Sequence, residues 1–136
     1  MSQKSATPPR TWKGSYAYHL GMHYDHVAPG IARATLSLQS KHCNPNGVCH
    51  GGAIFTFADD SMGAALHDLG PAGHHPVSTQ VNIHFMRSCK AGDRLQLETN
   101  IVTSGKRAAV AETRVMDADG RVVALVTASY LFVEKR

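Results

Sequence analysis

The chain has 136 residues, which is the size of one compact domain. A hydrophobic share of 43% and a charged share of 18% exclude disorder as its main state. The net charge of +4 is spread over scattered Lys and Arg residues. It suits an anionic ligand and gives no support to nucleic-acid binding.

The sequence also bears on the compartment. Three cysteines at irregular spacing, Cys43, Cys49 and Cys89, argue against a disulfide framework and for a reducing compartment. The N-terminus has no apolar stretch of signal-peptide length. No segment approaches the ~20 apolar residues of a membrane span. We therefore expect a cytoplasmic protein that does not act at a membrane.

The first part of the chain predicts little regular structure. Residues 1–10 contain Pro8-Pro9 and are typical of a loose tail. A short helix is expected within residues 11–23 from apolar side chains four apart, namely Trp12, Tyr16 and Leu20. We assign residues 1–24 to this tail and helix, and residues 25–136 to a single domain.

A strand and a loop come next. Apolar and polar residues alternate from Ala32 to Gln39, after a turn at Ala28-Pro29-Gly30. A period of two predicts a strand with one buried face. Residues 40–48 are rich in Asn, Pro and Gly and predict a loop.

Residues 51–69 predict the one long helix. At about 100° per residue, one broad apolar stripe contains Ile54, Phe55, Ala58, Met62, Ala65, Leu66 and Leu69, with Phe57 and Ala64 outside it. The helix is therefore expected to be largely buried. Asp59 falls at the edge of the stripe, whereas Asp60 falls beside His67 and is expected to face water or to pair with it.

The remainder predicts four strands joined by short connections. Alternation covers residues 77–85, 95–101, 108–116 and 122–132, with turns at 104–106 and 117–120. Short connections favour antiparallel neighbours. The expected fold is α+β, with one antiparallel sheet around one central helix.

Reactive side chains concentrate at residues 42–60. Gly51-Gly52 begins the helix after His50, which is not a strong capping residue. Glycines there would leave backbone N–H groups uncovered for an oxyanion or a polarised carbonyl. The alternative is a tight turn into the helix. Asp59 and Asp60 are costly in an apolar helix unless they are paired or solvated.

A metal site is the alternative use of this segment. His42, Cys43, Cys49 and His50 invite a zinc interpretation, but structural zinc sites generally use Cys pairs two to four residues apart, with a matching second pair. A nucleophilic cysteine is favoured still less. We expect neither a metal nor a cofactor.

The pattern Asn44-x2-Gly47-x2-His50-Gly51-Gly52-x6-Asp59 resembles the signature of hotdog-fold acyl-CoA thioesterases of the phenylacetate-degradation (PaaI-like) type. The resemblance extends over roughly residues 25–134 and includes the segment 77–87. It implies a hotdog fold, in which the sheet wraps the central helix. It also implies a homodimer with shared active sites. Such dimers often pair into a dimer of dimers, that is, a homotetramer, and the sequence leaves dimer and tetramer both open.

The resemblance assigns roles by position. Asp59 would be the catalytic carboxylate, as nucleophile or as general base on water. Gly51 would donate its N–H to the thioester carbonyl. Asn44 would orient water or the thioester, His50 would support the loop or the carbonyl side, and Ser78 would assist the water. The alternative for Asn44 is a turn cap, and for Ser78 a place on the outer side of its strand.

Substrate contacts are implied as well. The expected acyl pocket uses residues of the helix, namely Gly52, Phe55, Ala58 and Met62. The coenzyme A phosphates would be held by Arg87, Lys90, Lys106 and Arg107, for which the alternative is ordinary solvated charge. Aryl-acetyl, hydroxybenzoyl and medium-chain acyl groups all stay open. The alternative functions are a non-catalytic acyl-CoA-binding hotdog protein and, with less support, a hotdog dehydratase.

Overall fold

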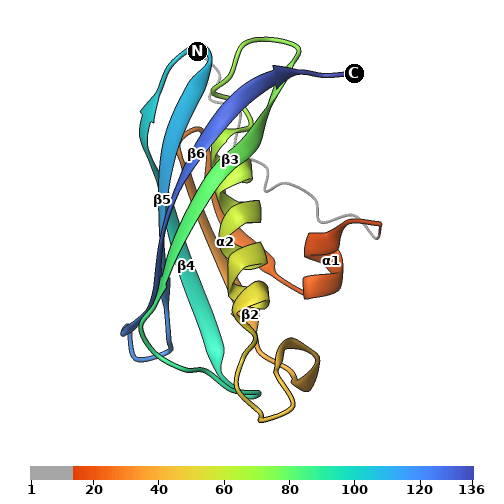
Figure 1. Cartoon of the computed structure of the whole chain (residues 1–136), viewed down its shortest axis with the longest axis vertical. Coiled ribbons are helices and arrows are strands. Elements are labelled where there is room, and N and C mark those ends of the chain that lie inside the picture. Colours follow the sequence, from red (N-terminus) through yellow and green to blue (C-terminus); the bar gives the residue numbers. More distant parts are fainter. Residues whose placement is uncertain (1–13) are drawn as a thin grey trace.

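The structure is a computed structural model that describes residues 14–136. The tail predicted for residues 1–10 lies outside this range. Six strands form one antiparallel sheet in the order β1-β2-β4-β5-β6-β3, which curves around helix α2 (Figure 1). This is the α+β architecture that the strand and helix patterns predict.

The elements follow the predicted order with two additions and one shorter helix. Strand β1 and the 3-10 turn η1 were not predicted, and α2 ends three residues before the predicted Leu69. The bounds are α1 Tyr16–Leu20, β1 His23–Ala28, β2 Ile31–Ser37, η1 Ser40–His42, α2 Gly51–Leu66, β3 His74–Phe85, β4 Arg94–Ser104, β5 Ala108–Met116 and β6 Val122–Glu134. None of these helices is long and apolar enough to cross a membrane.

The sequence does not predict strand β1, because the alternation of apolar and polar residues in it is broken. A register shift between Tyr24 and His26 puts two exposed residues in succession, so no period of two survives. Its hairpin with β2 turns at Gly30, which has a φ of +88° that favours glycine. The Gly30 N–H donates to the Ala65 carbonyl at 2.9 Å and so ties the hairpin to α2.

Helix α2 is buried on a different arc from the one predicted. Phe57 is 0% exposed and belongs to the core, whereas Phe55, predicted to be buried, is 39% exposed. The buried positions lie on both sides of Ile54, and they include Phe57 on one flank. Phe55 lies on the opposite flank, towards β3, which is the edge of the sheet formed by residues 14–136.

Strand β3 is the edge strand on this flank. It pairs only with β6 among the described residues, over almost its whole length of 12 residues. A bulge between Ser78 and Gln80 reverses the alternation, so that Ser78, Val81 and Ile83 are half-buried while Val77 and Thr79 are exposed. Ser78 therefore faces the helix and not the outer side of the strand.

The burial of α2 predicts a difference between its two phenylalanines. Phe57→Ala should lower the free energy of unfolding by about 3–5 kcal/mol, because it leaves a cavity in the closed core. Phe55→Ala is the matched control and should cost about 1 kcal/mol or less, as its side chain is partly in water. Urea denaturation of both variants tests this, and equal losses would contradict the burial described above.

Candidate functional site

The start of α2 is capped by His50. Its Nδ1 accepts a hydrogen bond from the Gly52 N–H at 2.7 Å, and its backbone is extended at the N-cap position. The sequence predicts a weak cap and two open N–H groups, and this prediction is wrong for Gly52, whose N–H is occupied. The Gly51 N–H donates to no group within residues 14–136. One donor therefore stays open at the positive end of the helix.

Both glycines lie against side chains that a Cβ would have to displace. A Cβ at Gly51 would lie 3.0 Å from Cζ of Phe85, at the end of β3. A Cβ at Gly52 would lie 2.8 Å from Nδ1 of His50. Phe85 pairs with Ala124 and shares the helix-facing alternation of Ile83, so its ring covers Gly51. It is nevertheless 56% exposed, because it is the last residue of β3.

The loop before α2 is fixed by backbone hydrogen bonds and by His42. The Asn44 N–H donates to the Val48 carbonyl at 2.7 Å. The buried His42 accepts from the Gln39 N–H at Nδ1 and donates from Nε2 to the Leu20 carbonyl at 2.6 Å. His42 thus fastens the loop to α1. The side-chain amide of Asn44 bonds to no residue of 14–136, so it is available to a ligand.

The two adjacent carboxylates of α2 point to opposite flanks. Asp59 accepts a hydrogen bond at Oδ1 from the Tyr130 hydroxyl of β6, at 2.7 Å. Asp60 accepts one at Oδ2 from the Tyr24 hydroxyl of β1. Asp60 therefore neither faces water freely nor pairs with His67, because its partner lies on the strand that the sequence did not reveal. Neither tyrosine was predicted.

The electrostatics of the two pairs are consistent with this geometry. Burial raises the pKa of Asp60, the Tyr24 hydrogen bond opposes that rise, and the charge of Asp59 adds to it. Burial and the neighbouring carboxylates raise the pKa of both tyrosines above the ordinary value. Tyr24 and Tyr130 therefore stay protonated and act as donors at neutral pH.

Ser78 lies beside the Asp59–Tyr130 pair. It is the cross-strand partner of Tyr130, and residues directly opposite on antiparallel strands project to the same face. Tyr130 is buried and reaches α2, so Ser78 also faces α2. The structure thus brings together two of the predicted site residues, Asp59 of α2 and Ser78 of β3, beside Tyr130 of β6.

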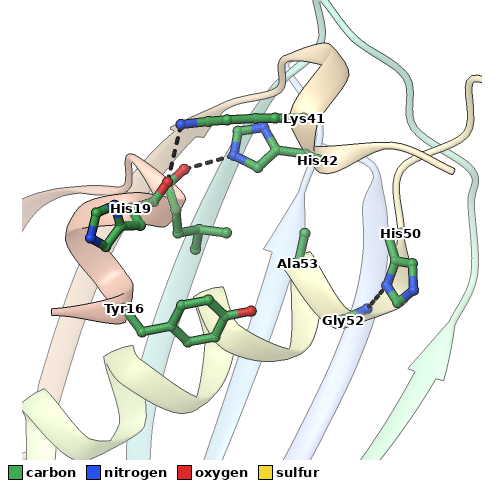
Figure 2. Close-up of a pocket in the computed structure, with 8 residues that line it drawn as sticks. Tyr16, His19, Lys41, His42, His50, Gly52 and Ala53 are labelled. Atoms are coloured by element: carbon green, nitrogen blue, oxygen red, sulfur yellow. Dashed lines mark hydrogen bonds between the residues drawn. The ribbon is translucent and has the colours of Figure 1, made fainter.

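A cavity of about 250 Å³ lies beside the first turn of α2, on the side that faces α1 (Figure 2). It is bounded by α1, η1 and the first turn of α2, and Lys41 closes one wall by donating to the His19 carbonyl at 3.0 Å. Its lining residues are Tyr16, His19, Leu20, Lys41, His42, His50, Gly52 and Ala53. Asp59 does not line it.

The remaining predicted substrate contacts do not lie together in one chain. Met62 and Ala58 are fully buried in the core and so do not face an open pocket. Arg87 and Lys90 follow β3, near the start of α2, whereas Lys106 and Arg107 occupy the turn between β4 and β5. The Arg107 carbonyl accepts a hydrogen bond from the Phe132 N–H of β6. Phe132 lies about 26 Å along β6 from Ala124, the residue that pairs with Phe85. One chain therefore does not gather these four cations at one end.

No cluster suited to a metal ion occurs in the part of the chain that the structure describes. Within residues 14–136, no group of three or more His, Cys, Asp or Glu side chains is arranged to hold one.

The contact of Gly52 with His50 predicts a contrast between two glycines of α2. Gly52→Ala should displace the His50 ring and lower the free energy of unfolding by about 0.5–2 kcal/mol, the usual range for a lost cap. Gly63→Ala should raise it by about 0.4–1 kcal/mol, since a Cβ there meets nothing within 4 Å. Chemical denaturation measures both, and a stabilised Gly52→Ala would refute the capping role.

Comparison with known proteins agrees with the fold. The family model described as Thioesterase superfamily matches residues 46–124. Acyl-coenzyme A thioesterase PaaI of Escherichia coli is 26% identical over 124 residues, which is 85% of this chain and 86% of the relative. Its solved structure has a TM-score of 0.80 and covers 86% of this chain and 83% of its own.

A second solved structure, that of smu.793 from Streptococcus mutans bound to acetyl-CoA, is 27% identical with a TM-score of 0.76. The match covers 85% of this chain and 90% of that one. The expected hotdog fold and hydrolase activity on thioester bonds are thereby confirmed. The chain belongs to the Thioesterase superfamily.

Proposed function

We propose that this protein hydrolyses the thioester of an aromatic or medium-chain acyl-CoA to the free acid and coenzyme A. The proposal is carried by one observation. Within residues 14–136, a Gly51 N–H that donates to no group, at the positive end of α2, accompanies a carboxylate, Asp59, that is held at one oxygen only. The relative named acyl-coenzyme A thioesterase and the neighbour bound to acetyl-CoA support this substrate class.

The site is completed by a second copy of the chain. Asp59 lies eight positions after Gly51, or about 12 Å along the helix. A single carbonyl group cannot contact both within one chain. An antiparallel pairing of two β3 edges about a two-fold axis would set two α2 helices in opposite directions, with Gly51 of each near Asp59 of the other. We propose this homodimer, assembled further as a dimer of dimers.

The reaction follows from these groups. The Gly51 N–H donates to the thioester carbonyl oxygen and stabilises the negative charge that develops there, with help from the helix dipole. Asp59 of the second copy either accepts a proton from the attacking water or attacks the carbonyl carbon itself. The carbon–sulfur bond then breaks and coenzyme A leaves as the thiolate, which takes up a proton. In the second case the acyl group remains on Asp59 as a mixed anhydride after coenzyme A has left, and water then hydrolyses it to the free acid. Asn44 orients the water or the thioester.

Tyr130 has a positioning role in this scheme. Its hydroxyl occupies Oδ1 of Asp59, which directs Oδ2 towards the substrate. Ser78, opposite Tyr130, is placed to hold the water. His50 acts indirectly, since it orders the first turn of α2 and so aims the Gly51 N–H.

Substrate binding would draw on both copies. Arg87 and Lys90 lie at the end of the molecule where α2 begins. In an antiparallel dimer, Lys106 and Arg107 of the second copy would approach that end. Their charges suit the coenzyme A phosphates. Phe55 is exposed on the Asp59 flank and would line the acyl pocket, whereas the cavity beside Gly52 offers further space next to the carbonyl.

Asp59→Asn should lower the rate of thioester hydrolysis about 10²–10⁴-fold, because it removes the base or nucleophile. Asp60→Asn is the matched control and should keep most of the activity, since Asp60 bonds to Tyr24 on the other flank. Free thiol released from a panel of aryl and medium-chain acyl-CoA esters is the measurement. Saturable binding without turnover by the wild type would instead show a non-catalytic acyl-CoA binder.

Tyr130→Phe should lower kcat about tenfold with little change in KM, the loss expected for one hydrogen bond to a charged group. Tyr24→Phe is the matched control and should leave kcat near that of the wild type. Steady-state hydrolysis kinetics measures both variants. A kcat that does not fall in Tyr130→Phe would remove Tyr130 from the mechanism and leave the thioesterase proposal intact.

A further inference from the structure

The three cysteines lie next to one another on adjoining segments. Cys43 and Cys49 face each other in an isolated antiparallel bridge that closes the loop before α2. A second bridge joins Val48 to Lys90 and brings Cys89 beside Cys49. All three are free thiols; Cys43 is half-exposed, whereas Cys49 and Cys89 are buried.

The backbone hydrogen bonds define the geometry of the first pair. The Asn44 N–H donates to Val48 at 2.7 Å, and the His50 N–H donates to His42 at 2.8 Å. These bonds flank Cys43 and Cys49, which exchange none themselves. Such a position brings two Cα atoms to about 4.5 Å, with the side chains close together. Disulfides span Cα separations of about 4.4–6.8 Å, so this pair meets the requirement.

The second pair is arranged differently. The Cys49 N–H donates to the Cys89 carbonyl at 2.7 Å, which is the hydrogen-bonded type of antiparallel position. Cα atoms there lie about 5.5 Å apart and the side chains diverge more. Cys89 is also buried and hence shielded from an oxidant in water. Both features favour Cys43 over Cys89 as the partner of Cys49.

We propose that Cys43 and Cys49 form an oxidative modification site, at which a peroxide converts the two thiols into an intrachain disulfide. The half-exposed Cys43 sulfur attacks hydrogen peroxide, the O–O bond breaks, and a sulfenic acid and one water result. The Cys49 sulfur then attacks Cys43, the S–O bond breaks, the S–S bond forms and a second water leaves. Two thiols and one peroxide thus give one disulfide and two waters.

The surroundings of Cys49 assign the order of these steps. Burial and the two neighbouring cysteines raise its pKa to about 11, so little of it is thiolate at neutral pH. Cys43 therefore reacts first, and Cys49 resolves the sulfenic acid. The resulting ring encloses residues 44–48 and fixes the backbone that carries Asn44 on one side and His50 on the other.

Hydroxylamine cleavage tests the linkage directly, because Asn46-Gly47 is an Asn–Gly bond between the two cysteines. The full chain is treated with hydrogen peroxide, weighed before and after alkylation in denaturant, and then cleaved. We expect a mass lower by about 2 Da before alkylation and one alkylated thiol. The fragments 1–46 and 47–136 should stay joined until dithiothreitol is added.

Three variants identify the partners. Cys89→Ala should give the same joined fragments, whereas Cys43→Ser and Cys49→Ala should give separate ones. Fragments that separate after oxidation of the wild type would overturn the proposal, as would three alkylated thiols, a disulfide between two chains, or a link lost in Cys89→Ala. Cys43 is half-exposed, so Cys43→Ser tests the site even where Cys49→Ala folds poorly. None of these readouts depends on thioesterase activity.

Discussion

The two tyrosine–carboxylate hydrogen bonds on either flank of α2 are the constraint on which the rest of the structure depends. An apolar helix enclosed by a sheet can hold two adjacent carboxylates only if each finds a donor, because an unpaired buried charge is costly. The sheet provides one donor from β6 and one from β1. Each bond fixes the rotation of α2 about its axis, and with it the direction in which the first turn presents Gly51 and His50.

The same pairs separate the roles of two chemically identical neighbours. Asp60 is enclosed between α2 and β1, and its raised pKa reflects that enclosure. Asp59 lies on the flank towards β6 and the open edge of β3, where a second chain would bring substrate. The doubled aspartate is ambiguous in the sequence, and it becomes interpretable only when the two tyrosines are located. The resemblance by position favours Asp59 as the proposed catalytic carboxylate, and the geometry gives a physical reason for that proposal.

Much of the fold could be predicted from sequence, because period-two alternation and one long apolar stripe survive in most elements. The errors have local causes. A bulge in β1 removes its alternation, and a second bulge in β3 turns Ser78 inward and Val77 outward. Partners distant in sequence, such as Tyr130 for Asp59, leave no local signal. The His50 cap was missed because its geometry depends on a glycine two residues later, which makes room for the ring.

The open edge of β3 joins these observations. Twelve residues of edge backbone, with Val77 and Phe85 exposed beside it, form a surface on which another strand can pair, and long uncovered edges invite association. Gly51 and Asp59 of one chain are too far apart to contact the same carbonyl group, and the same pairing would bring Gly51 of each chain near Asp59 of the other. One contact would then cover the backbone groups of β3 and complete a site that a single helix cannot contain. The bulge belongs to this arrangement, since it lets one strand direct Ser78 to the helix face while its outer edge stays free to pair.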